Sequence, residues 1–244
     1  MCKKAICIFI FCLSLFFALF DGIYAGENEI REKLKEIFGE VAVEEIVPAD
    51  LPGLYAVFTK GNPVFFYDER GYVFFGEIWS INGTNYTVAL SVKRALKKLK
   101  EQGINPLFYI GKGRKEVYLF MNPECPHCKE VLSHLKKYES EIRVGIYPVM
   151  FPYFQSGYVL TMSILCSKNP EEELFNIISG RSFPNVSFDT CTQDRIRFLQ
   201  DTLEKISKLG ISSIPILIVD NEVIIGSILP RISQTIEAFI KSGR

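Results

Sequence analysis

The chain has 244 residues, of which 48% are hydrophobic and 23% are charged, so it is globular rather than disordered and long enough for two modest domains. Its 28 Lys and Arg residues are matched by 28 Asp and Glu residues. Without an overall charge, nothing in the composition favours binding to nucleic acid or to an anionic membrane.

The first 25 residues have the pattern of an export signal. Lys3 and Lys4 precede an uncharged, apolar run at residues 5–20, and Ala25 offers a small residue for cleavage. The run is slightly short for a membrane span. We therefore expect a cleaved signal peptide over residues 1–25, with an uncleaved anchor as the alternative.

Export changes how the seven cysteines are interpreted, because three of them lie inside the signal. The mature chain would keep Cys125, Cys128, Cys166 and Cys191. An even number of cysteines in an exported protein is expected to be paired, since the compartment is oxidising.

Residues 26–84 predict a small α+β domain. The stretch 27–38 predicts a helix with an apolar stripe formed by Ile30, Leu34, Ile37 and Phe38. Residues 41–88 then resemble an antiparallel meander of short strands separated by turns. The strands at 64–67 and 72–75 are apolar on both faces, so either the helix or a second copy of the domain must cover them. We favour self-association.

A helix at 85–104 would link this domain to the rest of the chain. Its Lys and Arg residues are more typical of a solvated helix face than of a contact with an acidic partner. From residue 105 the pattern is that of an α/β domain with a helical insertion, because strands and helices alternate at both ends of the segment. The expected strands are 117–121, 142–150, 215–219 and 222–226, and the expected helices are 126–138, 156–167, 170–179, 193–209 and 231–241.

The motif Cys125-Pro126-His127-Cys128 lies where a strand gives way to a helix. Pro126 suits the first helical position, which places Cys125 at the positive end of the helix. That end, together with a protonated His127, favours the thiolate form of Cys125, whereas a small opposing effect comes from Glu124. Cys128 lies about one turn further in and should stay protonated. The spacing therefore predicts an attacking thiol and a resolving thiol.

Two other uses of a CxxC motif fit less well. A zinc site needs further ligands, and apart from the two remaining cysteines the chain offers only His127 and His134. A static disulfide across two residues closes little chain entropy and so stabilises weakly. We therefore predict a catalytic redox pair, with no metal and no cofactor.

Two stretches together resemble a thioredoxin fold: "FMNPECPHCKEVL" and, about ninety residues later, "SSIPILIVDNEVIIG". The resemblance implies that Pro215 is a cis-proline facing the CxxC motif. It also implies that Ile214 offers its backbone to an extended substrate. On local pattern alone, an ordinary trans proline at the start of a strand is the alternative.

Nearly the whole chain after residue 40 resembles the periplasmic disulfide isomerase family of DsbC and DsbG. The stretch from "LPGLYAVF" to "INGTNYT" resembles their N-terminal dimerisation domain, and "ILCSKNPEEELFNIISGRS" followed by "DTC" resembles their second cysteine pair. The resemblance implies a dimerisation domain at 26–84, a linker helix at 85–104 and a thioredoxin-like catalytic domain at 105–244. It also implies a structural disulfide between Cys166 and Cys191, with free buried cysteines as the alternative.

Three residues bear on the direction of electron flow. Pro126-His127 resembles the oxidase DsbA, whereas Ile214 before the proline resembles the reductant thioredoxin; DsbC-type isomerases typically differ at both places. Leu119 occupies the position at which thioredoxin and DsbA have an acidic residue, which agrees better with the isomerase branch. A water or a backbone group would then have to take the proton of the resolving thiol.

The resulting hypothesis is a periplasmic thiol:disulfide interchange enzyme of DsbC type. We expect a homodimer that acts on misoxidised or unfolded exported proteins and is reduced at Cys125 and Cys128 by a membrane electron donor. The alternatives are a monomeric oxidase or reductase with the same site, and a chaperone-like binder of unfolded chains.

Overall fold

The computed structural model describes residues 21–40, 42–49, 51–59, 64–81, 83–181, 191–209 and 211–242. The chain divides into two compact units, Met1–Gly76 and Glu77–Arg244. Most of the expected signal peptide, residues 1–20, lies outside the described residues. None of the described helices combines the length and the apolar character needed to cross a membrane.

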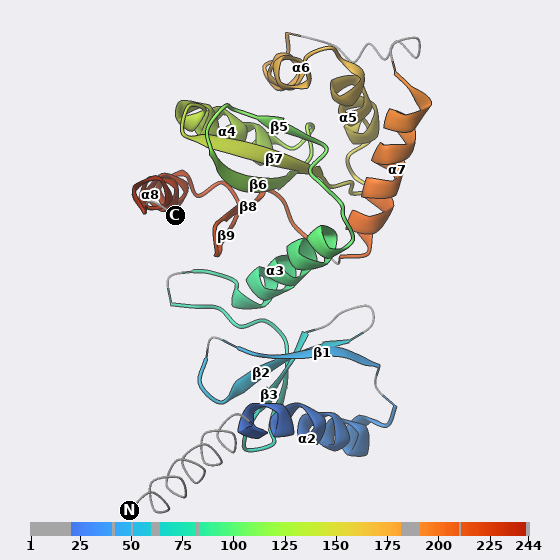
Figure 1. Cartoon of the computed structure of the whole chain (residues 1–244), viewed down its shortest axis with the longest axis vertical. Coiled ribbons are helices and arrows are strands. Elements are labelled where there is room, and N and C mark those ends of the chain that lie inside the picture. The colour runs from blue at the N-terminus through green and yellow to red at the C-terminus, as the bar shows by residue number, and fades with distance from the viewer. Residues whose placement is uncertain are drawn as a thin grey trace, which may run out of the picture. The chain divides into compact units, whose positions relative to one another are not determined.

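In the first unit, one helix packs on a four-stranded antiparallel meander (Figure 1). Its elements are α2 (Asp21–Phe38), β1 (Val43–Pro48), β2 (Leu54–Thr59), β3 (Val64–Asp68) and β4 (Val73–Phe75). The helix predicted at 27–38 lies within α2 and ends at the same residue, Phe38. Ile30 and Leu34 of the predicted stripe are buried against the sheet with Ile46, Val57 and Tyr67.

The end of α2 and the edge strand β4 expose apolar side chains. Ile37 and Phe38, in the last turn of the helix, are 57% and 44% exposed, and Phe38 meets Phe75 edge to face at 5.6 Å. Phe74 and Phe75 are adjacent residues that point to opposite faces of β4, and they are 48% and 59% exposed. Both faces of this edge strand therefore remain largely open to solvent in the part of the chain that is described.

The second unit is built on a five-stranded sheet with the order β5-β7-β6-β8-β9. The central strands β6 and β7 are parallel, and every other pairing is antiparallel. The strands are β5 (Phe108–Ile110), β6 (Lys115–Met121), β7 (Ile142–Pro148), β8 (Ile216–Val219) and β9 (Glu222–Ile225). The helices are α3 (Tyr86–Glu101), α4 (Pro126–Leu135) with the 3-10 turn η1 (Lys136–Tyr138), α5 (Gly157–Cys166), α6 (Pro170–Ile178), α7 (Gln193–Ser207) and α8 (Leu229–Lys241).

Both faces of this sheet are covered, which explains the unbroken apolar run of β6. Val117, Leu119 and Met121 face a core shared with α4 and α8. Phe120 faces the opposite core, which contains the buried side of α3 and the end of α7. Helix α3, for which the family resemblance implied a linker role, thus packs as a layer of the second unit.

Helices α5, α6 and α7 form an insertion between β7 and β8 (Figure 1). The structure joins Cys166, at the end of α5, to Cys191, just before α7, by a disulfide with a Cα–Cα distance of 4.8 Å. The bond lies in an apolar cluster that includes Leu107, Met162 and Leu199. The predicted fold class, an α+β domain followed by a thioredoxin-like α/β domain with a helical insertion, is confirmed.

Candidate functional site

The CxxC motif lies at the carboxyl end of β6, where the chain turns into α4. Cys125 is the N-cap residue of α4 in an extended backbone conformation, and Pro126 takes the first helical position, where its missing N–H costs nothing. The free N–H groups of the first helical turn therefore surround Cys125. The positive end of the α4 dipole therefore lies at Cys125.

The two thiols have unequal surroundings. Cys128 is fully buried, whereas Cys125 keeps 5% of its surface exposed, and neither is in a disulfide. Burial raises the pKa of Cys128 well above its usual value, and the neighbouring Cys125 raises it further, while a hydrogen bond from the Asn122 backbone acts in the opposite direction. Cys128 is therefore a protonated thiol at neutral pH, and Cys125 is the one that a substrate can reach.

His127 is exposed in the first turn of α4 and is held from two sides. Its Nδ1 lies 3.2 Å from Ser227 Oγ, in the segment after β9, and 3.7 Å from the carboxylate of Glu130. Both the His127 and the Glu130 side chains are exposed, so a contact of this length contributes little to stability. The imidazole is thus fixed beside the N-terminus of α4.

Glu124, directly before Cys125, contacts the segment that precedes α5. Its carboxylate accepts a hydrogen bond of 2.9 Å from the backbone N–H of Ser156, directly before α5. The Glu124 carboxylate is therefore held at the start of α5.

The peptide bond between Ile214 and Pro215 is cis, and the sheet register places it beside the CxxC motif. In the antiparallel pairing of β6 with β8, Phe120 faces Ile216, so Pro215 comes next to the last residue of β6. Pro215 is buried, and Ile214 is half-buried and packs against the cores on both faces of the sheet. The structure therefore brings both residues to the same edge as Cys125 and Cys128, whereas Cys166 and Cys191 lie in a separate cluster.

Asn122 is a site residue that the sequence analysis missed. Its side chain is fully buried, donates to Val149 O at 2.9 Å and accepts from Glu124 N at 2.9 Å. Gly157 packs against it so closely that an added Cβ would lie 2.4 Å from Asn122 Nδ2. Asn122 thereby ties the CxxC loop to the loop after β7. An asparagine between an apolar strand and a proline is a turn signal that could have pointed to it.

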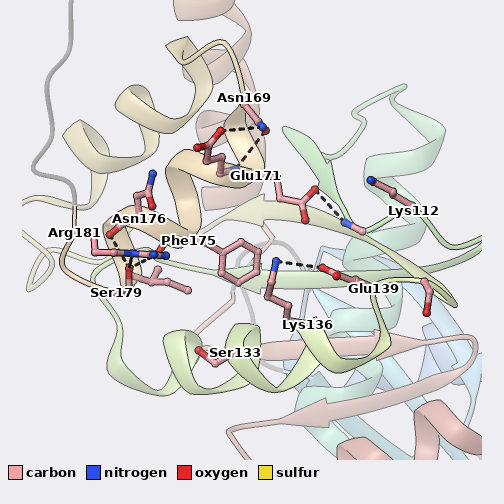
Figure 2. Close-up of a pocket in the computed structure, with 14 residues that line it drawn as sticks. Lys112, Ser133, Lys136, Glu139, Asn169, Glu171, Phe175, Asn176, Ser179 and Arg181 are labelled. Atoms are coloured by element: carbon pink, nitrogen blue, oxygen red, sulfur yellow. Dashed lines mark hydrogen bonds and ion pairs between the residues drawn. The ribbon is translucent and has the colours of Figure 1, made fainter.

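A cavity of about 890 Å³ lies at the other end of α4, between η1, α6 and the turn after β5 (Figure 2). Figure 2 shows Lys136 beside the ring of Phe175, 4.3 Å from its centroid, while its ammonium group is 3.1 Å from Glu139. None of the CxxC residues lines this cavity.

Among the described residues, no cluster of His, Cys, Asp or Glu could hold a metal ion.

Comparison with protein families gives a match over the N-terminal part of the chain. Residues 24–88 match the family described as disulfide bond isomerase protein N-terminal domain, DsbC_N. Comparison with curated proteins gives no match.

Among solved structures, the chain is similar to the catalytic domain of Proteus mirabilis ScsC, with 18% identity, a TM-score of 0.48, and coverage of 62% of this chain and 98% of that one. It is also similar to a periplasmic thioredoxin-like protein from Salmonella enterica serovar Typhimurium, with 17% identity, a TM-score of 0.45, and coverage of 57% and 91%. A third is the thiol-disulfide exchange protein alpha-DsbA2 from Wolbachia pipientis, with 14% identity, a TM-score of 0.47, and coverage of 63% and 98%.

A CxxC motif at the N-terminus of a helix, next to a cis-proline on the neighbouring strand, defines a thiol–disulfide oxidoreductase. Residues 24–88 match the N-terminal domain family of disulfide bond isomerases, which confirms the predicted resemblance to DsbC-like proteins over that part of the chain.

Proposed function

We propose that this chain is an exported disulfide isomerase, in which Cys125 attacks incorrect disulfides and Cys128 resolves the mixed disulfide. The observation that carries the proposal is the unequal pair of thiols at the start of α4, in a chain with a DsbC-type N-terminal domain. The exposed apolar residues of β4 and the sequence resemblance support a homodimer, and the basic, apolar N-terminus supports export to the periplasm.

The reaction begins when the Cys125 thiolate attacks one sulfur of a substrate disulfide. A new S–S bond forms between Cys125 and the substrate, and the second substrate sulfur leaves as a thiolate. Another substrate thiolate can then attack the mixed disulfide, which forms a different substrate disulfide and frees Cys125. This route is an isomerisation, because no electrons are gained or lost overall.

The second route uses Cys128. Its thiolate attacks Cys125 in the mixed disulfide, releases the substrate as a thiol and leaves a bond between Cys125 and Cys128. The substrate has then gained two electrons, so a two-electron donor must reduce the enzyme before it acts again. A donor in the membrane, with a dithiol of its own, would supply them.

The surroundings of Cys128 favour the first route. Cys128 must lose its proton before it can attack, but it is fully buried and its pKa is raised. Leu119, which is also fully buried, takes the place where related enzymes have an acid that accepts this proton. Slow release by Cys128 gives a bound substrate time to rearrange, which suits an isomerase. Pro126-His127, in contrast, favours the oxidase alternative.

Single-cysteine variants test the proposal with a scrambled protein substrate and reduced enzyme. Cys125→Ala should abolish reactivation of the substrate, whereas Cys128→Ala should retain isomerisation and accumulate a mixed disulfide at Cys125. If Cys128→Ala loses all isomerisation while the wild-type enzyme, first oxidised to its Cys125–Cys128 disulfide, efficiently oxidises reduced substrate, the oxidase alternative holds instead. Full rescue by the variant that lacks both cysteines would support the chaperone-like binder.

Oligomeric state needs a separate measurement. Sedimentation at micromolar concentration should give the mass of a dimer. A monomer would contradict the proposed homodimer without affecting the assignment of the two thiols.

A further inference from the structure

The residue that holds the ring of His127 comes from near the end of the chain. Nδ1 of His127 lies 3.2 Å from Oγ of Ser227, and the two residues are 100 positions apart in the sequence. Ser227 belongs to residues 226–228, the short segment between β9 and α8. The orientation of the imidazole therefore depends on a second segment of the fold as well as on α4.

The backbone fixes the segment that carries Ser227 on both sides. Gly226 N donates to Pro215 O at 2.8 Å, and Leu229 N donates to Ser227 O at 2.9 Å. Gly226 has a φ of 83°, a conformation that favours glycine. Ser227 is thus held between the carbonyl of the cis-proline and the start of α8, and its side chain has a defined direction.

The hydroxyl group of Ser227 does not cap α8. A serine beside a helix start commonly accepts a hydrogen bond from a free backbone N–H of the first turn. Here the N-cap residue is Ile228, and it makes no side-chain cap hydrogen bond. Within the described part of the chain, the contact with His127 is the one hydrogen bond that the Ser227 side chain makes. The common structural role of a serine at this place is therefore not the role of Ser227.

The charged groups near His127 come from α4 and the loop before it. Glu130 lies 3.7 Å from the same Nδ1 atom, and the carboxylate of Glu124 is bonded to Ser156. Residues 223–230, on the other side, contain no Asp, Glu, Lys, Arg or His. Because a hydroxyl group both donates and accepts, Ser227 can hold Nδ1 of either the neutral or the protonated ring.

We propose that Ser227 is a positioning residue of the CxxC site, which holds Nδ1 of His127 and leaves Nε2 for the sulfur atoms that carry negative charge during exchange. No described residue bonds to Nε2. The inference rests on the proposed function, in which thiolates attack and leave at each step. An N–H group beside a charged sulfur stabilises it, and a ring that turns away does so for only part of the time. Ser227 thereby favours the dithiol form of the Cys125–Cys128 pair over its disulfide.

The test measures how this pair equilibrates with glutathione. In that reaction the enzyme disulfide and two glutathione molecules give the enzyme dithiol and one glutathione disulfide. Ser227→Ala should lower the equilibrium constant by about three- to fivefold, which corresponds to a fall of about 15–20 mV in the reduction potential of the enzyme. The effect is modest because the side chain of His127 is 70% exposed.

Ser233→Ala is the matched control. Ser233, in α8, makes the same kind of contact, with its Oγ 2.7 Å from Nε2 of His134 in the last turn of α4. This contact lies at the end of α4 opposite to Cys125, so its loss should leave the equilibrium constant at the wild-type value.

A second comparison tests whether the serine acts through the histidine. His127→Phe removes both ring nitrogens and should lower the equilibrium constant by more than Ser227→Ala does. In the His127→Phe background, Ser227→Ala should cause no further change, because its effect has no other route.

Three results would overturn the role of Ser227. In the first, Ser227→Ala leaves the equilibrium constant unchanged. In the second, it lowers the constant equally in the presence and absence of His127. In the third, Ser233→Ala lowers the constant by as much as Ser227→Ala does. If instead the wild-type Cys125–Cys128 pair forms no disulfide at any ratio of reduced to oxidised glutathione, the proposed function itself fails.

Discussion

The contact between Asn122 and Gly157 allows a quantitative test of how the CxxC loop is held. Asn122→Ala removes a buried amide that satisfies Val149 O and Glu124 N. Each group left without a partner costs about 1–3 kcal/mol, and of the two residues Val149 is buried whereas Glu124 is partly exposed. We therefore expect Asn122→Ala to lower the free energy of unfolding of the second unit by about 2–4 kcal/mol.

Gly157→Ala should act through the same amide. An alanine usually stabilises a helix by up to about 1 kcal/mol relative to glycine. Here its Cβ would lie 2.4 Å from Nδ2 and 2.9 Å from Oδ1 of Asn122, so the amide must move and its hydrogen bonds weaken. The expected result is a loss of about 1–3 kcal/mol. Once Asn122 is alanine the obstacle is gone, and Gly157→Ala should become neutral or slightly stabilising.

The two single variants and the double variant form a cycle that can be measured by urea unfolding, with amide exchange of residues 149–157 to localise the effect. We expect a coupling of about 2 kcal/mol. Gly26→Ala in α2 is a matched control, since its Cβ would meet only Tyr55 Oη at 3.7 Å. Effects of Asn122→Ala and Gly157→Ala that add within about 0.5 kcal/mol would refute the steric argument.

Two further predictions concern the rest of the second unit. Replacing Cys166 and Cys191 by alanine should lower its free energy of unfolding by about 3.5 kcal/mol, because the bond closes a loop with a sequence separation of 25; a loss below about 1 kcal/mol in urea unfolding would contradict this. Burial and the nearby Lys137 lower the pKa of His134, whose Nε2 lies 2.7 Å from Ser233 Oγ. The resulting stability is fully present above the unfolded-state pKa of 6.5 and is lost as the pH falls through the lowered pKa of the folded state, so His134→Gln should flatten the acid limb of a stability–pH curve.

Elements with a strong local signal could be predicted from the sequence. The helix expected at 126–138 is α4 with its 3-10 turn, because a proline at the first position and regular apolar spacing are local properties. Strand β5 was not predicted, since three residues are too few to show a period. Its strand conformation comes from pairing with β7, in which Tyr109 faces Gly145.

The candidate site was predictable only where one segment determines it. The inequality of Cys125 and Cys128 follows from their places on a single helix, and their surroundings in the structure are indeed unequal. The hydrogen bond from Ser156 to Glu124 joins residues 32 positions apart. No local pattern shows that the segment after β7 returns to the CxxC loop, so the role of Asn122 required the tertiary structure.

The combination of His127 and a buried Cys128 is compatible with the proposed isomerase, although a histidine at this position of the CxxC motif resembles the oxidase DsbA. A group that stabilises the Cys125 thiolate stabilises the reduced enzyme and so raises its reduction potential. An enzyme with a high reduction potential acts as an oxidant when its own cysteine pair is in the disulfide form. The same high potential keeps Cys125 reduced whenever an electron donor is present, and isomerisation requires a reduced Cys125. Because Cys128 is buried and has no acid at Leu119 to take its proton, we expect a mixed disulfide to survive long enough to rearrange. Under the proposed function, the direction of electron flow is then decided by the redox partner that restores the Cys125 thiol. A potential near that of thioredoxin, measured against glutathione, would contradict this account.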